Sequence, residues 1–174
     1  MNQPTGSKIL AFGLLFVVGC VLFVFLSPEN FYPVQTSTSP DRPGDAQPAT
    51  VNYVHDGDTL FLTTGTDDNL KVRLLAVDTP EVGECYGSEA TEFLRQLLPE
   101  GSTVFTLADT EPLDQYGRSL LMVWTPDGEL VNLELVEKGY AEAVFIGANR
   151  MFEDEVEAAE DTAQASSLGI WGSC

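Results

Sequence analysis

The chain has 174 residues, enough for one domain of ordinary size and an appendage, and 44% of them are hydrophobic, which suffices for a core. Its formal net charge is −19, from 27 acidic against 8 basic residues, and this charge argues against nonspecific nucleic-acid binding at low salt. At about 1 M salt the Debye length falls to roughly 3 Å and the repulsion largely disappears, so the composition favours a halophilic protein; an acidic protein from an ordinary habitat is the alternative.

The first predicted element is an apolar helix. Residues 9–26 form an uncharged, almost wholly apolar run at the lower length limit for a transmembrane helix. Lys8 precedes this run and acidic residues follow it, so residues 1–8 are expected in the cytoplasm and the rest of the chain outside. A cleaved signal peptide and lipidation at Cys20 are the alternatives. All three interpretations place the following domain on the extracellular side of the membrane.

Residues 27–49 are rich in Ser, Thr, Pro, Asp and Gln and show neither helical nor strand periodicity. This composition predicts a flexible linker, which would reach roughly 25–30 Å. The remaining residues, 50–174, are predicted to form a single domain.

Short extended segments separated by turn signals follow the linker, and three amphipathic segments lie among them. Strands are predicted at 50–54, 59–64, 70–77, 102–109 and 118–124, and helices at 87–101, 130–140 and 151–166. Ser88 is the predicted N-cap of the first of these helices. The pattern predicts an α+β domain built on a five-stranded OB-fold β-barrel, a Greek-key barrel of the oligonucleotide-binding type, with three helices.

Two cysteines lie in this domain, Cys85 and Cys174. An exported pair is permitted to oxidise, and the bridge would close a loop of about 90 residues, which is worth roughly 4 kcal/mol in the entropic model. Two free thiols are the alternative. Cys85 has no histidine motif nearby, so it is not expected to act as a nucleophile.

The stretch HDGDT, residues 55–59, is the first that could carry chemistry. Asp56-Gly57 between two strands is a favoured hairpin turn, and the spacing does not match an EF-hand. His55 is expected to be a solvated turn residue. A second carboxylate at Asp58 places oxygen ligands at the mouth of the barrel.

The stretch LKVRLLAVDTPE, residues 70–81, is the second stretch that could carry chemistry. Arg73 interrupts a strand of apolar residues, and on a straight strand it would lie about 26 Å from Glu81. These two residues can meet only if the chain turns back after Val77. Pro80 keeps the preceding residue out of the helical region, so a loop is expected there.

The third stretch, LDQYGRSLLMVW, carries Arg118 just before an apolar strand. Each stretch alone is explained by an ordinary turn, but together two arginines and several carboxylates suit the hydrolysis of a phosphodiester. Carboxylate oxygens of Asp58 and Asp78 favour Ca²⁺ or Mg²⁺. Glu81 could accept a proton from water, and guanidinium groups could hold phosphate oxygens.

Six motifs, in order and spacing, resemble the staphylococcal nuclease (thermonuclease) family: DGDTLFL, VRLLAVDTPE, YGSEATEFL, DQYGRSLLMVW, VNLELVEKGYA and GIW. The resemblance covers residues 50–173. It implies a five-stranded barrel with three helices and a Ca²⁺-dependent endonuclease that cleaves DNA and RNA to leave 3′-phosphates. Single-stranded substrate is favoured, and a monomer without a protein partner is expected.

The resemblance also implies roles for individual residues. Asp58 and Asp78 match the calcium-ligand carboxylates, Thr79 matches the position that supplies a main-chain carbonyl, and Asp56 matches an acid in the outer shell of the metal. A second set matches the catalytic positions of the family. Glu81 matches the general base or water-orienting residue, and Arg73 and Arg118 match the two arginines that bind the phosphate.

The sequence also departs from the family pattern. Phe145 stands where the best-known member has a nucleotide-contacting tyrosine, Gly147 stands near a second such position, and the usual basic patch is missing. Cys85 and Cys174 resemble the cysteines of secreted variants, which supports the disulfide. A catalytically silent binding barrel and an extracellular calcium-binding module remain as alternatives to a nuclease.

Overall fold

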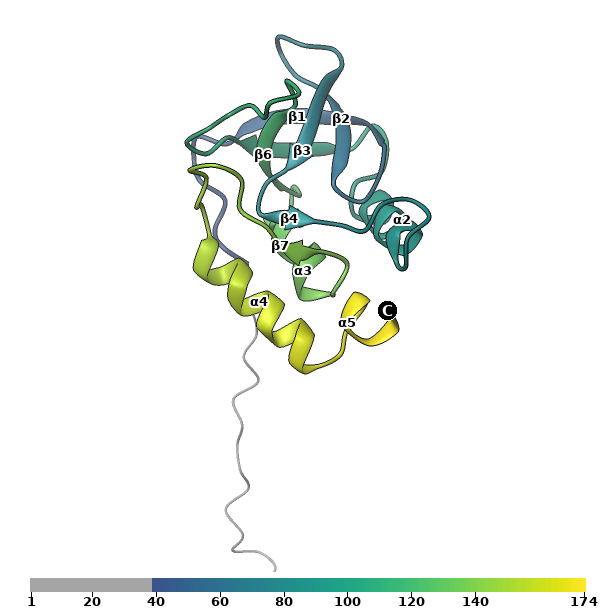
Figure 1. The fold of residues 1–174 in the computed structure, drawn as a ribbon. Coiled ribbons are helices and arrows are strands. Elements are labelled where there is room, and N and C mark those ends of the chain that lie inside the picture. Colours follow the sequence, from purple (N-terminus) through teal and green to yellow (C-terminus); the bar gives the residue numbers. More distant parts are fainter. Residues whose placement is uncertain (1–38) are drawn as a thin grey trace, which may run out of the picture. The chain divides into compact units, whose positions relative to one another are not determined.

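A computed structural model describes residues 39–174 (Figure 1). The segments predicted at 1–8 and 9–26 and most of the predicted linker lie outside the described residues. Between Ser39 and Cys174, no helix is long and apolar enough to cross a membrane.

Five strands close into a barrel in the order β1-β2-β3-β6-β5, which confirms the predicted architecture (Figure 1). Adjacent strands run antiparallel except β3 and β6, which are parallel. Closure gives each strand two neighbouring strands. The barrel strands are β1 (Gln47–Val54), β2 (Thr59–Thr63), β3 (Leu70–Leu74), β5 (Thr103–Leu107) and β6 (Ser119–Trp124).

The barrel begins earlier than the predicted boundary at residue 50, because β1 starts at Gln47. Pro48 belongs to the part of β1 that pairs with β5 alone, so the missing N–H of this proline is tolerated in the strand. The residues before β1 also contact the domain. Arg42 lies 3.7 Å above the ring of Phe105, and the hydroxyl of Ser39 accepts the main-chain N–H of Leu130 at 2.8 Å.

Alternating side chains separate the two faces of the barrel strands. Leu60 and Leu62 of β2 and Val72 and Leu74 of β3 are fully buried in the core. The residues between them therefore lie on the outer face of the barrel. Arg73 is one of these outer-face residues, yet it is only 6% exposed because the chain after β3 folds over it.

The three predicted helices are present as α2 (Gly87–Leu97), α3 (Val131–Glu137) and α4 (Glu153–Ala165), and a single further turn forms α5 (Ile170–Ser173). The prediction of Ser88 as the N-cap of α2 is wrong, because the N-cap is Tyr86 in the left-handed conformation. A tight turn leads into the helix: the main-chain N–H of Gly87 donates to the carbonyl of Glu84 at 3.2 Å.

The chain bends sharply after β3, two residues before the predicted position. The bend lies at Leu75 and Ala76, and Ala76 has φ 60°. After it the chain forms β4 (Val77–Asp78), which pairs with β7 (Glu142–Ala143) outside the barrel (Figure 1). The fully buried amide of Asn132 donates to the carbonyl oxygens of Leu75 at 2.8 Å and Leu121 at 3.1 Å, and this holds the bend against β6.

Cys85 and Cys174 form a disulfide with their Cα atoms 5.9 Å apart, as predicted. The bridge joins the segment that precedes α2 to the end of α5. It therefore attaches the C-terminal helices to the loop that carries Glu81.

Candidate active site

The β1–β2 hairpin brings two carboxylates together in an ordered turn. One oxygen of Asp56, Oδ1, accepts the main-chain N–H groups of Asp58 at 3.1 Å and Thr59 at 2.7 Å. The carbonyl of Asp58 accepts the N–H of Leu74 at 2.9 Å, which ties the turn to β3. Asp58 is thus fixed beside the strand that carries Arg73.

The guanidinium of Arg73 joins the hairpin to the segment after the bend. Its Nη1 lies 3.0 Å from Oδ2 of Asp58, and its Nη2 donates to Oδ1 of Asp78 at 2.6 Å. Nη1 also donates to the carbonyl of Val77 at 2.8 Å. Thr79 completes the cluster, because its main-chain N–H and its hydroxyl both donate to Oδ2 of Asp58 at 3.2 Å. The structure therefore brings four predicted site residues into one network.

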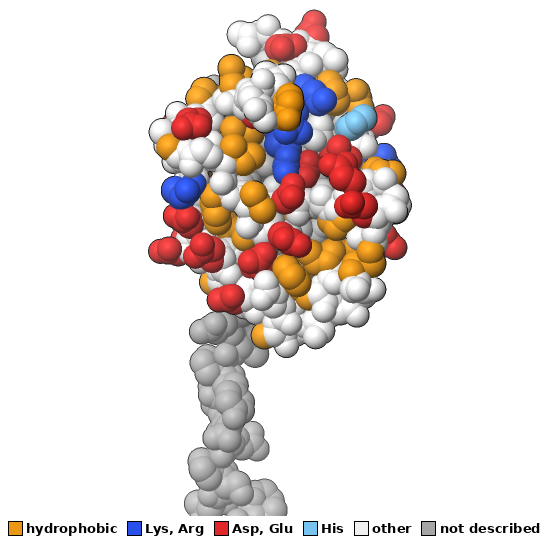
Figure 2. All heavy atoms as spheres, viewed as in Figure 1, with side chains coloured by type: hydrophobic (Ala, Val, Ile, Leu, Met, Phe, Trp, Pro, Cys, Tyr) orange, Lys and Arg blue, Asp and Glu red, His pale blue; other side chains and the backbone are white. Residues whose placement is uncertain are grey.

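Acidic groups outnumber basic ones in this network. Burial raises the pKa of Asp58, and the charge of Asp56 raises it further, while Arg73 and the hydrogen bonds from Thr79 and Thr59 oppose the increase. In Figure 2, basic side chains over the barrel strands meet a group of acidic side chains between the barrel and α2. Two carboxylates, those of Asp58 and Asp78, contact Arg73, and the charge of Asp56 acts on Asp58 as well, so a second cation would be favoured here.

The donor set fits a hard cation. Asp58 is buried, whereas the side chain of Asp78 is 58% exposed, and both offer carboxylate oxygens. Among residues 39–174, no three acidic, histidine or cysteine side chains are placed to hold one metal ion together. Two carboxylates and a main-chain oxygen, completed by water, suit Mg²⁺ or Ca²⁺, which keep water ligands in open sites.

Gly57 makes the contact between the hairpin and Thr79 possible. A Cβ at this position would lie 2.5 Å from Oγ1 of Thr79, 2.8 Å from its Cβ, and 3.0 Å from the Cβ of Ala90 in α2. The glycine predicted from its turn propensity is therefore required for close approach between two chain segments.

Glu81 lies on the exposed loop that follows the network. Its main-chain N–H donates to Oε2 of Glu84 at 3.0 Å, and its carbonyl accepts the N–H of Glu84 at 2.9 Å. Within residues 39–174, its carboxylate makes no hydrogen bond or ion pair. Gly87 allows this loop to pack closely, because a Cβ at position 87 would collide with the carbonyl oxygen of Glu81.

Arg118 is held by an aspartate that was not among the predicted site residues. Nε of Arg118 donates to Oδ2 of Asp114 at 2.6 Å, and Oδ1 of Asp114 accepts the main-chain N–H groups of Arg118 and Tyr116, both at 2.9 Å. In the described part of the chain, the Nη groups of Arg118 make no hydrogen bond. Aspartate four residues before arginine, with a glycine between them, is the signal that could have identified this turn.

The two arginines come from neighbouring parts of the barrel. Arg73 of β3 pairs with Leu120 of the parallel strand β6, and Arg118 immediately precedes β6. The structure records no direct contact between Arg118 and the carboxylate network.

The two positions that depart from the family pattern lie after β7. Phe145 is half-buried against the core, and the guanidinium of Arg150 lies 5.7 Å from its ring centroid. Gly147 has φ 60°, and a Cβ there would collide with the carboxylate of Glu111. A side chain at position 147 would therefore require a change in the backbone conformation at this residue and a shift of the Glu111 carboxylate.

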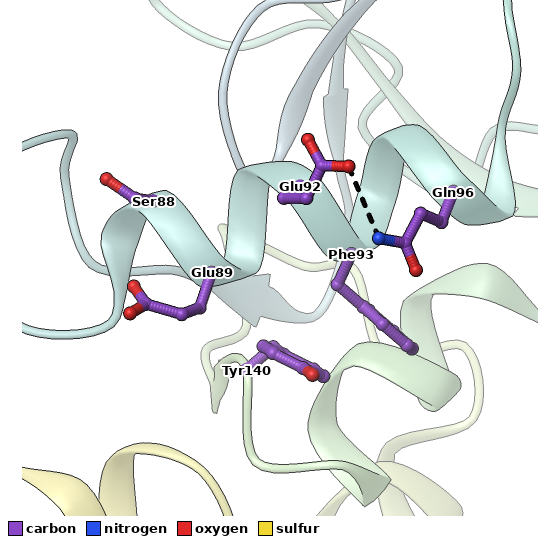
Figure 3. Close-up of a pocket in the computed structure, with 6 residues that line it drawn as sticks. All are labelled: Ser88, Glu89, Glu92, Phe93, Gln96 and Tyr140. Atoms are coloured by element: carbon purple, nitrogen blue, oxygen red, sulfur yellow. Dashed lines mark hydrogen bonds between the residues drawn. The ribbon is translucent and has the colours of Figure 1, made fainter.

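A pocket of about 390 Å³ lies apart from these residues, between α2 and the segment after α3 (Figure 3). The ring of Tyr140 stacks between those of Phe93 and Tyr86, with centroids 4.1 Å and 5.4 Å away. None of the predicted site residues lines the pocket. Its lining residues are Ser88, Glu89, Glu92, Phe93, Gln96 and Tyr140.

Comparisons with known proteins identify the family of the chain. The family model described as "Staphylococcal nuclease homologue" matches residues 71–173. A thermonuclease of Staphylococcus intermedius is 32% identical over 170 residues, which cover 94% of this chain and 98% of the relative. A thermonuclease of Staphylococcus hyicus is 34% identical over 125 residues, covering 68% of this chain and 72% of the relative.

Endonuclease YhcR of Bacillus subtilis is 34% identical over 134 residues, which cover 70% of this chain but 11% of that longer protein. The family model spans more than half of the chain, and the first relative aligns over nearly its whole length. The chain therefore belongs to the staphylococcal nuclease family.

Proposed function

We propose that this chain is an endonuclease that hydrolyses phosphodiester bonds of DNA and RNA, requires Ca²⁺ and leaves 3′-phosphates. The observation that carries the proposal is the convergence of Asp58 and Asp78 on the buried guanidinium of Arg73. A barrel that only binds nucleic acid does not need two carboxylates beside a phosphate-binding arginine. The names of the relatives, thermonuclease and endonuclease, support the same chemistry.

Asp58, Asp78 and the main-chain carbonyl of Thr79 would hold the metal ion, with Asp56 in its outer shell. When bound, the ion would supply positive charge that orients water and neutralises the phosphate. Asp56 also keeps the hairpin in shape through its two main-chain hydrogen bonds. A change at Asp56 would therefore affect the position of Asp58.

Arg73 and Arg118 would bind the scissile phosphate. The Nη groups of Arg118, which make no hydrogen bond in the described part of the chain, can offer two parallel N–H donors to phosphate oxygens. Arg73 donates to Asp78 and two main-chain carbonyl groups, so it is preorganised at the edge of the carboxylate network. Glu81 lies on an exposed loop, and its carboxylate makes no hydrogen bond or ion pair among residues 39–174, so it is available to orient water and accept its proton.

Digestion of single-stranded DNA by the full chain tests the proposal, with Ca²⁺ or with chelator, at several salt concentrations. We expect cleavage that needs Ca²⁺ and leaves 3′-phosphate ends. Arg118→Ala should lower the turnover number strongly, while Arg95→Ala, an exposed arginine in α2, is the matched control. Binding without cleavage under every condition would favour the silent barrel.

The location and working conditions of the enzyme form a second part of the proposal. The apolar run at 9–26 would anchor the chain with its N-terminus inside and residues 50–174 on the extracellular side of the membrane. The net charge of −19 supports activity in concentrated salt. Fractionation of cells and a salt series of the cleavage rate test these two statements separately.

A further inference from the structure

A β-bulge in β1 turns an aromatic side chain out of the barrel. Ala49 and Val51 point into the core, so simple alternation would also bury residue 53. The pairing of β1 with β2 shifts register between Val51 and Tyr53, and Val54 takes the core position instead. Tyr53 is therefore 38% exposed on the outer face.

Hydrogen bonds hold this bulge. The side-chain amide of Asn52 donates to the carbonyl of Asp68 at 2.8 Å, and its oxygen accepts the hydroxyl of Thr63 at 2.9 Å. These contacts fix the extra residue of the bulge to the β2–β3 turn. The outward orientation of Tyr53 is thus fixed by the strand register and by the contacts of Asn52.

Tyr53 begins a row of side chains across three strands. Its ring stacks on that of Phe61 of β2, with centroids 4.6 Å apart and planes 15° from parallel. Nζ of Lys71 of β3 lies 5.8 Å from the centroid of Phe61, and the ring of His55 meets Phe61 edge-on at 6.4 Å. Within residues 39–174, no ring or cation covers the second face of Tyr53.

This row lies next to the candidate active site. Phe61 pairs with Lys71 in the β2–β3 ladder, and Thr59 pairs with Arg73 two residues further along. Lys71 and Arg73 share the outer face of β3, about 7 Å apart along the strand. A nucleic-acid strand with one phosphate at Arg73 can therefore continue along the outer face of the barrel to Phe61 and Tyr53.

We propose that Tyr53, Phe61 and Lys71 form a substrate-binding platform on which a base of single-stranded nucleic acid, next to the cleaved phosphodiester, stacks against the free face of Tyr53. The inference rests on the proposed nuclease function and assigns a binding surface outside its catalytic residues. Lys71 is one of three lysines in the chain, and here it is placed to contact a phosphate of the bound strand.

Stacking suits a nuclease with a net charge of −19. A basic patch would lose most of its attraction at high salt, because affinity that comes from phosphate contacts falls steeply as salt rises. Stacking of a base on an aromatic ring does not depend on ion pairing and accepts any base. At high salt, Tyr53 would therefore continue to contribute to the affinity for nucleic acid, while the contribution of Lys71 is weakened by screening. In Figure 2, hydrophobic and basic side chains are exposed side by side over the barrel strands.

Binding of a fluorescein-labelled oligothymidylate of twelve nucleotides to the full chain tests the platform. Fluorescence anisotropy is measured in chelator, which prevents metal-dependent cleavage during the titration. We expect Tyr53→Ala to weaken the affinity by about 5- to 150-fold, the range for one base stacked on one ring. Tyr53→Phe should retain the affinity, because it keeps the ring.

Leu168→Ala is the matched control, since Leu168 is 39% exposed and lies between α4 and α5. The Tyr53→Ala loss should persist in 1 M KCl, while the loss caused by Lys71→Ala should nearly vanish there. Equal affinities of Tyr53→Ala and the parent, or a loss as large in Leu168→Ala, would overturn the platform. Because binding is read without cleavage, absent nuclease activity with a normal Tyr53 effect would overturn the proposed function alone.

Discussion

Asp114 binds the side chain and the main chain of Arg118 at once. One carboxylate oxygen accepts Nε–H at 2.6 Å and the other accepts the main-chain N–H at 2.9 Å. The side chain of Asp114 is only 6% exposed, whereas that of Arg118 is 25% exposed. Asp114 thus fixes the backbone and the Nε end of Arg118 and leaves the Nη groups of this arginine available to bind phosphate.

Replacing Asp114 by Ala should lower the turnover number about 10- to 100-fold, because small displacements of a group that binds the reacting phosphate cost this much. Asp114→Asn keeps an acceptor for the main chain and should lose less. The cleavage rate at saturating substrate is the measurement, and Asp127→Ala, in an exposed turn, is the control. An unchanged turnover number in Asp114→Ala would show that Arg118 needs no such support.

Replacing Gly57 by Ala should push Thr79 away from Asp58 and reduce cleavage more than stability. The new methyl group cannot be accommodated beside the side chain of Thr79 without moving the segment after β4. Gly65→Ala is the matched control, because it lies in the β2–β3 turn and a Cβ there would have no neighbouring atom within 4 Å. Cleavage and thermal unfolding are compared for both variants; equal activities would contradict the close approach.

Acid should remove the contribution of Asp109 to stability. Its Oδ2 accepts the N–H groups of Arg150 at 2.6 Å and Met151 at 2.9 Å. Burial opposes ionisation, but these hydrogen bonds and those from Thr110 outweigh it and lower the pKa of Asp109. A carboxylate with a lowered pKa stabilises the fold above its unfolded pKa of about 3.9, and this contribution is lost as the pH falls through the folded-state pKa.

The variant Asp109→Asn isolates that charge. We expect it to lower the free energy of unfolding by about 1 kcal/mol at pH 7 and by less as the pH falls below about 4. Urea unfolding of the parent and the variant at pH 7, 5 and 3 measures the difference. A difference that is constant across this range would mean that the charge of Asp109 is not responsible.

Loss of the disulfide should destabilise the domain by roughly 4 kcal/mol, because a loop of about 90 residues would no longer be closed in the unfolded chain. Cys174→Ser is measured by urea unfolding with and without reductant. Reductant should bring the parent to the stability of the variant and leave the variant unchanged. A parent that is insensitive to reductant would exclude a stabilising role of the bridge.

The barrel could be predicted from the sequence because its strands alternate clearly and its turns carry Gly, Asp and Asn. The bend at Ala76 could not, since an alanine with positive φ has no signal in the sequence. The amide of Asn132, 57 residues away from Leu75, holds that bend. Pro48 falls within the predicted linker because the sequence does not show that this part of β1 pairs on one side only.

The carboxylates and arginines of the site were identified from their motifs, and the structure brings Asp58, Arg73, Asp78 and Thr79 together. Asp114 was missed although its spacing from Arg118 is a signal that could have identified it. The close contacts of Gly57 and Gly87 have no such signal. A Cβ at Gly87 would collide with the carbonyl of Glu81 across a tight turn, and a Cβ at Gly57 would collide with Thr79, which belongs to a different segment of the chain.

The disulfide between Cys85 and Cys174 closes residues 85–174 into a covalent ring, and the residues before Cys85 lie outside this ring. Asp58, Arg73, Asp78 and Glu81 precede the ring, whereas Arg118 is within it. A protease that cuts once inside the ring, for example beside Tyr116, which is 77% exposed, opens the ring without releasing a fragment. The nicked chain stays in one piece until the bridge is reduced, so both arginines remain in the same molecule.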